Sequence, residues 1–143
     1  MSQFNFHKNS NPLSPPPRLL PVLEKLKKAY LLWHEYHGTL AKTHRYSLGQ
    51  RIDDFFVQAI EAIVAASFLS KQEKIPYVRI AIRKIDMIKV LLMIVWESKS
   101  MDTKKYATLS VEIDVVGKML GGWNGQLQKQ NSPESANRRT GEK

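Results

Sequence analysis

The stretch that most constrains this chain is residues 75–96, IPYVRIAIRKIDMIKVLLMIVW, which is too apolar for an ordinary surface helix. One helical face repeats at alternating steps of four and three residues: Ala81, Ile85, Ile88, Leu92 and Val95. A second set of apolar residues falls outside that face: Ile82, Val90, Met93 and Ile94. Because a surface helix normally turns a polar face to water, the second apolar flank predicts a partner.

The same stretch also carries positive charge. Arg79 and Arg83 lie one helical turn apart, and Lys84 follows them. The chain has 22 Lys and Arg against 13 Asp and Glu, and residues 18–129 alone hold 18 bases and 11 acids, a net charge of +7. Charge of this size attracts polyanions and makes their binding sensitive to salt. The alternative is a set of solvated charges that only keeps an assembly in solution.

The two ends of the chain differ from its middle. Residues 1–17 form a polar arm that ends in three prolines, and residues 130–143 form a polar tail, so both are predicted to be disordered. The N-terminus lacks the apolar core of a signal peptide, and no uncharged apolar run reaches about 18 residues. With no cysteine in the chain, we expect a cytoplasmic protein without disulfides or a membrane segment.

Helical periodicity predicts an all-α fold, an antiparallel up-down-up-down four-helix bundle over residues 18–129. The expected helices cover residues 18–40, 48–70, 76–97 and 103–125, with Pro76 in the first turn of the third and residues 71–74 as a polar turn. Ser47 and Gln50 match a capping box, and Asp102 is suited to cap the fourth helix.

Two of these helices carry further information. Between Phe55 and Leu69 only three residues are polar, so the second helix is expected to be buried on most of its circumference. The fourth helix has an apolar stripe: Tyr106, Leu109, Ile113, Val116, Leu120 and Trp123. It also carries Gly117, Gly121 and Gly122, which lower helix propensity by about 1 kcal/mol each and predict the close approach of another backbone.

No pattern indicates catalysis or a cofactor. His34 and His37 are spaced to share a metal ion, but no neighbouring carboxylate completes a site, and Glu-x-x-His pairs are missing. The segment from Gly117 to Trp123 lacks the Lys-Ser/Thr ending of a phosphate loop. We therefore expect a protein that is not an enzyme and binds no metal or cofactor, with a small metallo-bundle or hydrolase as the weaker alternative.

The basic residues form two predicted zones. The first is Arg79, Arg83 and Lys84, and the second is Lys42, His44, Arg45 and Arg51. In an antiparallel bundle these zones are expected at opposite ends of the second helix, roughly 30 Å apart. Since the aromatic residues are expected in the core, contact with the phosphate backbone is favoured over base stacking.

Two short segments, RYSLGQRI at residues 45–52 and VGKMLGGW at residues 116–123, add specificity. With the four-helix layout, they resemble the accessory variability determinants of diversity-generating retroelements, over residues 18–128. The resemblance implies a non-enzymatic partner of a reverse transcriptase that assembles as a pentameric barrel. Its basic surface would engage the polymerase and the template RNA or cDNA to support mutagenic retrohoming. Proteins encoded by intervening sequences of 23S ribosomal RNA genes share the bundle, so a structural or partner-binding oligomer is the alternative.

The resemblance also implies roles for particular residues. Arg79, Arg83 and Lys84 are the first choice for contact with RNA or the polymerase. Lys42, His44, Arg45 and Arg51 are the second choice, although Arg51 could instead form an ion pair with Asp54 or a neighbouring subunit. Structural roles in close helix packing fall to Gly49, Gly117, Gly121 and Gly122, with Trp123 closing the end of the bundle.

Overall fold

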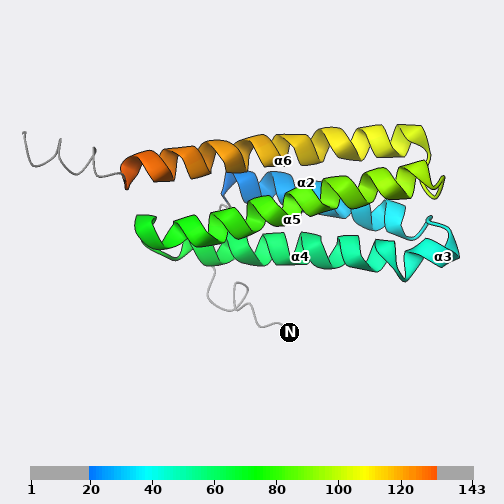
Figure 1. Cartoon of the computed structure of the whole chain (residues 1–143), viewed down its shortest axis with the longest axis horizontal. Coiled ribbons are helices and arrows are strands. Elements are labelled where there is room, and N and C mark those ends of the chain that lie inside the picture. The colour runs from blue at the N-terminus through cyan, green and yellow to red at the C-terminus, as the bar shows by residue number, and fades with distance from the viewer. Residues whose placement is uncertain (1–19, 132–143) are drawn as a thin grey trace, which may run out of the picture.

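A computed structural model describes residues 20–131 of the chain. Its helices are α2 (Pro21–His37), α3 (Lys42–Arg45), α4 (Leu48–Ser67), α5 (Lys71–Glu97) and α6 (Thr103–Gln130). Figure 1 shows the four long helices side by side with alternating direction, and α3 as one short turn between α2 and α4. Residues 20–131 contain no strand. The predicted all-α four-helix bundle is therefore confirmed, whereas the arm of residues 1–17 and nearly all of the tail lie outside the described residues.

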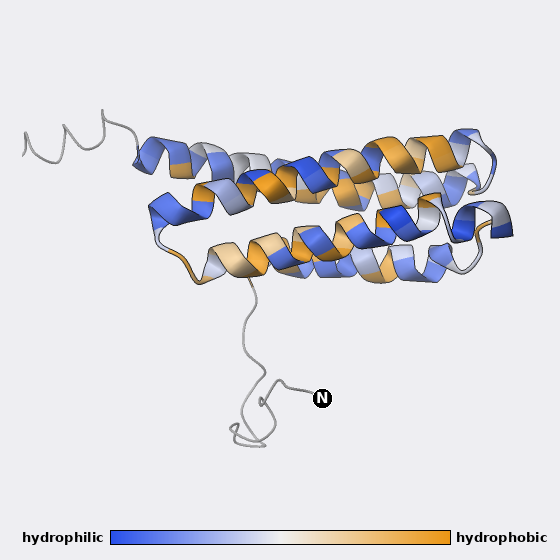
Figure 2. Cartoon of the chain, turned by 60° about the horizontal axis from the view of Figure 1, so that its bottom comes forward, coloured by the Kyte–Doolittle hydropathy of each residue, from blue (hydrophilic) through white to orange (hydrophobic). Residues whose placement is uncertain are grey.

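The core lies between four helices arranged as a square. α2 packs against α4 and α6, and α5 packs against the same two helices, so α2 and α5 lie across the core from each other. The largest completely buried side chains come from all four helices and the loop after α2: Trp33, Phe56, Leu26, Leu40, Ile52, Ile63, Ile85, Ile88, Leu92, Leu109, Ile113 and Leu120. Figure 2 shows the resulting alternation of apolar and polar residues along each helix. Within this part of the chain, none of the helices has the length and apolarity needed to cross a bilayer.

The start of α5 differs from the prediction. Residues 71–74 belong to the helix and do not form a polar turn, because the chain enters it at Ser70, whose backbone is extended (φ −68°, ψ 163°). The Ser70 hydroxyl donates to the Glu73 carboxylate at 2.7 Å, and the Lys74 amide bonds the Ser70 carbonyl at 3.0 Å. These contacts open the helix one turn before Pro76, so that residue lies inside α5 and not in its first turn.

Other predictions about the helix ends are only partly correct. The first helix ends at His37 and the second at Ser67, three residues earlier than expected in each case. The predicted capping box is wrong, because the Ser47 hydroxyl donates to the Thr43 carbonyl at 2.9 Å instead of accepting from the helix. The predicted cap of the last helix is confirmed, since Asp102 accepts a hydrogen bond from the Lys105 amide at 2.8 Å.

The expectation that the second helix is buried on most of its circumference is also wrong for the single chain. Val57 and Val64 of α4 are 39% and 38% exposed, and Phe68 just after the helix is 84% exposed. A bundle of four helices covers only one face of each helix, so the second apolar flank of α4 has no cover within the described protomer.

Gly49 is a position where the packing requires glycine. A Cβ atom at Gly49 would lie 2.8 Å from two ring atoms of His37 and 3.1 Å from the backbone oxygen of His44. The His37 ring has little freedom to move away, because it stacks on Trp33 with ring centroids 5.0 Å apart. Absence of a side chain at Gly49 therefore lets the start of α4 approach the end of α2.

A carboxylate on α4 joins that helix to α2. The indole Nε1 of Trp33, a residue with no exposed surface, donates to Asp53 at 3.3 Å. The pKa of the Tyr30 phenol is raised above its ordinary value of 10.0, chiefly by burial and then by its hydrogen bond to Asp53 and the negative charge of Asp53. Asp53 thus accepts hydrogen bonds from two aromatic side chains of α2.

Replacement of Asp53 by Ala is expected to lower the free energy of unfolding at neutral pH by about 1–3 kcal/mol, because the buried Trp33 indole loses its acceptor. The pKa of Tyr30 should fall toward its ordinary value, as measured by NMR of ¹³C-labelled tyrosine, since two of the causes that raise it are removed. Because the pKa of Tyr30 is raised in the folded state, its contribution to stability is fully present at a pH below the ordinary pKa of 10.0. That contribution is lost as the pH rises through the raised pKa.

Asp54→Ala is the matched control for this change. Among the described residues, Asp54 accepts a side-chain hydrogen bond from Gln50 alone, at the surface, so its loss should change stability by no more than about 0.5 kcal/mol. Equal effects of the two substitutions in urea unfolding would show that Asp53 does not join the helices.

Candidate nucleic-acid interface

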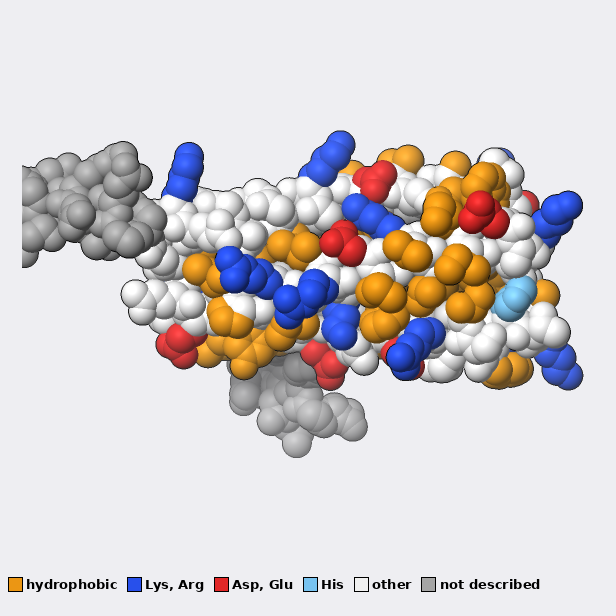
Figure 3. All heavy atoms as spheres, in the orientation of Figure 1, with side chains coloured by type: hydrophobic (Ala, Val, Ile, Leu, Met, Phe, Trp, Pro, Cys, Tyr) orange, Lys and Arg blue, Asp and Glu red, His pale blue; other side chains and the backbone are white. Residues whose placement is uncertain are grey.

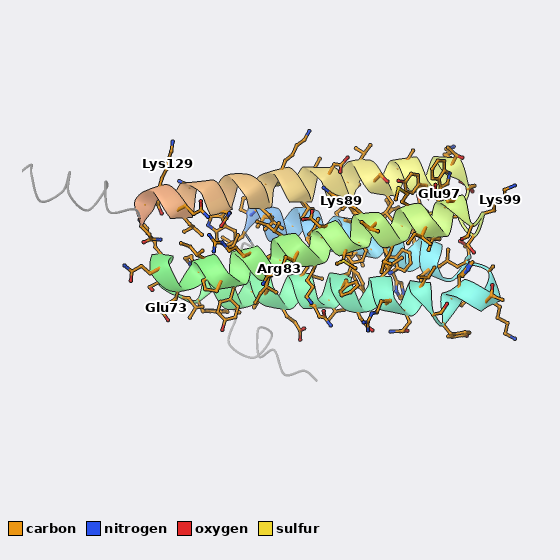
Figure 4. All side chains as sticks on the ribbon, in the orientation of Figure 1. Glu73, Arg83, Lys89, Glu97, Lys99 and Lys129 are labelled. Atoms are coloured by element: carbon orange, nitrogen blue, oxygen red, sulfur yellow. The ribbon has the colours of Figure 1, made fainter. Side chains whose placement is uncertain are left out.

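The outward face of α5 has a charged half and an apolar half. Arg79 and Arg83 are exposed in the half that follows Lys71. The half that leads to Glu97 exposes Met87 (42%), Val90 (47%), Met93 (41%) and Ile94 (40%). Figure 4 labels Arg83 between Glu73 and Glu97, and Figure 3 shows Lys and Arg side chains over the middle of this face and hydrophobic side chains gathered toward its right.

Phe55 of α4 brings the two predicted basic zones together. The Arg51 guanidinium lies 5.5 Å from the centroid of the Phe55 ring, and the Lys84 ammonium lies 5.3 Å from the same centroid. Both distances are suited to cation–π attraction. The expected separation of roughly 30 Å between the zones is wrong for these two residues, because antiparallel α4 and α5 place the first turn of one beside the middle of the other.

We name Arg51, Arg79, Arg83 and Lys84 the basic strip. None of the four forms an ion pair with a described residue, and the expected pair between Arg51 and Asp54 is not formed. Other bases are neutralised locally: Lys28 pairs with Glu112 at 3.0 Å, and Lys89 with Asp114 at 3.4 Å. The strip therefore keeps its positive charge available for an external anion.

Arg45 has a structural position just before the start of α4. Its guanidinium donates to the Leu40 carbonyl at 3.0 Å, its Nε is buried without a hydrogen-bond partner, and its own carbonyl accepts from His37 Nε2 at 2.9 Å. These contacts hold the turn between α2 and α4, so little of the Arg45 charge faces outward.

The other two residues of the second predicted zone, His44 and Lys42, differ in exposure. His44 is half-buried, and its ring Nδ1 bonds to the Ser100 hydroxyl between α5 and α6. Lys42 is exposed at the start of α3. The structure thus separates Arg51 from Lys42, His44 and Arg45 and adds it to the first zone.

Phe55 is the member of the site that sequence reasoning missed. Aromatic residues were expected in the core, but Phe55 is only half-buried, whereas its neighbour Phe56 has no exposed surface. The available signal was the spacing of Arg51 and Phe55, since residues four apart share one face of a helix.

The glycines of α6 behave differently from the prediction. A Cβ at Gly117 would lie 3.0 Å from Nζ of Lys89, which is a side chain and not a backbone. Apart from the neighbouring backbone of α6 itself, no atom of the described residues lies within 4 Å of a Cβ at Gly121 or Gly122, so the expected approach of another backbone is wrong for both within residues 20–131. Trp123 is half-buried and packs against both apolar clusters of the bundle.

The histidine pair does not build a metal site. His37 is occupied by Trp33 and Arg45, and His34 is exposed. Among residues 20–131, no group of three or more His, Asp or Glu side chains is placed to hold a metal ion.

Fold and surface together define a four-helix bundle with an unpaired basic strip and an uncovered apolar flank. Comparison with known families identifies the group: a family model described as bAvd-like matches residues 22–127. The chain belongs to this family, which confirms the resemblance to accessory variability determinants. A comparison with curated proteins finds no match.

Arg45→Ala and Arg51→Ala should separate the structural arginine from the available one. Arg45→Ala is expected to lower the free energy of unfolding by about 1–3 kcal/mol, because it removes a charged donor from the Leu40 carbonyl. Arg51→Ala should cost at most about 1 kcal/mol, the value of an exposed cation–π contact. Urea unfolding measures both, and a larger loss for Arg51→Ala would contradict this division.

Proposed function

We propose that this protein is a non-catalytic accessory factor that binds nucleic acid and a reverse transcriptase. The observation that carries the proposal is the basic strip, which has no ion-pair partner among the described residues. Membership in the bAvd-like family supports the accessory role. The cytoplasm is the compartment in which such a factor would meet template RNA.

The chemistry of the strip favours phosphate as the group recognised. Arg guanidinium groups donate two parallel hydrogen bonds to phosphate oxygens, and each neutralised phosphate releases counterions. Arg79 and Lys84 are five residues apart, about 7.5 Å along the helix axis, so the strip spans a short run of phosphates. Contacts of this kind position a nucleic acid without reading its sequence.

We propose further that protomers assemble into a homo-oligomeric ring, a pentamer by resemblance to the family. The apolar half of α5 and the exposed Val57 and Val64 of α4 supply uncovered apolar surface for subunit contacts. A closed ring buries such surface without leaving a free end. Repetition of the basic strip in every subunit would strengthen the attraction for a polyanion.

The uncovered apolar surface also favours a second candidate, a structural or partner-binding oligomer of the type encoded in 23S ribosomal RNA genes. Both candidates require assembly, but only the first requires the basic strip to contact nucleic acid. RNA binding therefore distinguishes them.

Arg79→Glu with Arg83→Glu is expected to abolish RNA binding, because both side chains are exposed on the strip. Fluorescence anisotropy with a labelled RNA over a series of salt concentrations measures the loss, and binding by the unmodified chain should weaken steeply with salt. Lys25→Glu with Lys104→Glu is the control, since it makes the same change in net charge at exposed positions outside the strip. Equal losses in both double variants would refute the strip as the site.

Val90→Glu with Met93→Glu is expected to convert the assembly into monomers, because two charges would be buried in each subunit contact. Sedimentation velocity at micromolar concentration gives the mass. Val111→Glu is the control, since Val111 is 63% exposed but lies on α6. A monomeric unmodified chain would disprove the ring.

A further inference from the structure

The bundle has a hollow at the end where α2 begins and α6 finishes, the end at which Figure 4 labels Glu73 and Lys129. α2 has 17 residues, whereas α5 has 27 and α6 has 28, so the last turns of α6 run on beyond the start of α2. The hollow has a volume of about 520 Å³. Its walls come from α2, α4, α5 and α6 and from Leu20, the residue before α2.

The walls of the hollow are apolar, and its charges have a single sign. Leu20, Met119 and Trp123 are large hydrophobic side chains of the lining that a ligand could contact. Two lysines, Lys74 and Lys118, belong to the lining, and no Asp or Glu of residues 20–131 does. The hollow is therefore complementary to a molecule with an apolar body and a negative group.

Lys74 is held in place at this site. Its ammonium donates to the Ala66 carbonyl at 2.7 Å, close to the end of α4. An ammonium has three protons, so this bond leaves donors for a second acceptor. A lysine fixed by one hydrogen bond loses less side-chain entropy when it binds an anion than a free lysine does.

We propose that this hollow binds a small apolar anion, with a medium-length hydrocarbon chain or an aromatic body and one carboxylate. The volume lies within the range of about 300–1,000 Å³ that is usual for small-molecule sites. The apolar body lies against Trp123 and Met119, and the carboxylate lies at Lys74 and Lys118. This site is separate from the basic strip, since it uses none of the strip's residues.

Decanoate is a suitable probe, used below its micelle concentration with the full chain. It should shift the indole cross-peak of Trp123, assigned with Trp123→Phe, and leave that of the buried Trp33 unchanged. Decylammonium, which has the same chain and the opposite charge, should bind at least tenfold more weakly. Equal binding of both probes would overturn the proposed anion preference, and an unchanged Trp123 peak at millimolar decanoate would overturn the site itself.

Two glycines offer a matched pair of variants. A Cβ at Gly122 or at Gly121 meets nothing within 4 Å, so a larger side chain is accommodated at either position, but only Gly122 lines the hollow. Gly122→Leu should weaken decanoate binding at least tenfold, and Gly121→Leu should leave it unchanged. Equal effects of the two variants would overturn the proposal.

Three further experiments test the role of Lys118 and two other possible occupants of the hollow. Lys118→Glu should weaken decanoate binding, whereas Lys104→Glu at the far end of α6 should not, and the reverse order would contradict the assignment. Tighter decanoate binding after combined replacement of Phe4, Phe6 and Leu13 by Ala would assign the hollow to the chain's own N-terminal segment instead. If the unmodified chain and Gly121→Leu bind phosphatidylglycerol vesicles and Gly122→Leu does not, the hollow binds a membrane lipid and not a free anion.

Discussion

The packing of Trp33 against Phe56 holds α2 against α4 inside the core. Both side chains have no exposed surface, and their rings stack with centroids 6.2 Å apart, which joins α2 to α4 at the middle of the core. Large aromatic side chains bury about 150–250 Å² each, so their burial contributes strongly to the stability of a core. The hydrogen bond from the Trp33 indole to Asp53 satisfies the polar atom that this burial would otherwise leave without a partner.

The inward position of Phe56 also accounts for the outward position of Phe55. Successive residues of an α-helix are turned by about 100°, so the Phe55 side chain leaves the helix in a different direction from that of Phe56. Phe55 therefore lies at the surface between α4 and α5, where Arg51 and Lys84 both pack on its ring. The partly exposed Phe55 ring attracts both positive side chains and so holds Arg51 and Lys84 on one aromatic ring despite their mutual repulsion.

The sequence was sufficient for the type and order of the four long helices, because the apolar stripes around Ile85 and Ile113 extend over several turns, but it did not predict the short helix α3. It failed at the helix starts, where a few local contacts decide the outcome: the hydrogen bonds of Ser70 begin α5 before Pro76, and those of Ser47 turn its hydroxyl away from α4. For the candidate site, exposure of Arg79 and Arg83 followed from their place on the outer face of α5. The contact of both Arg51 and Lys84 with Phe55 depends on the position of α4 relative to α5 along their common axis. The periodicity of apolar residues within each helix contains no information on that relative position.

The division of α5 into a charged half and an apolar half has a mechanical consequence. An α-helix transmits rotation and translation along its whole length as a stiff rod, and α5 has no break between Arg83 and Met87. If protomers meet through Met87 and Met93 as proposed, any torque applied there would therefore reorient Arg79 and Arg83 as well. The proposed subunit contact and the proposed contact with a nucleic acid would then be coupled mechanically, so that neither could change alone.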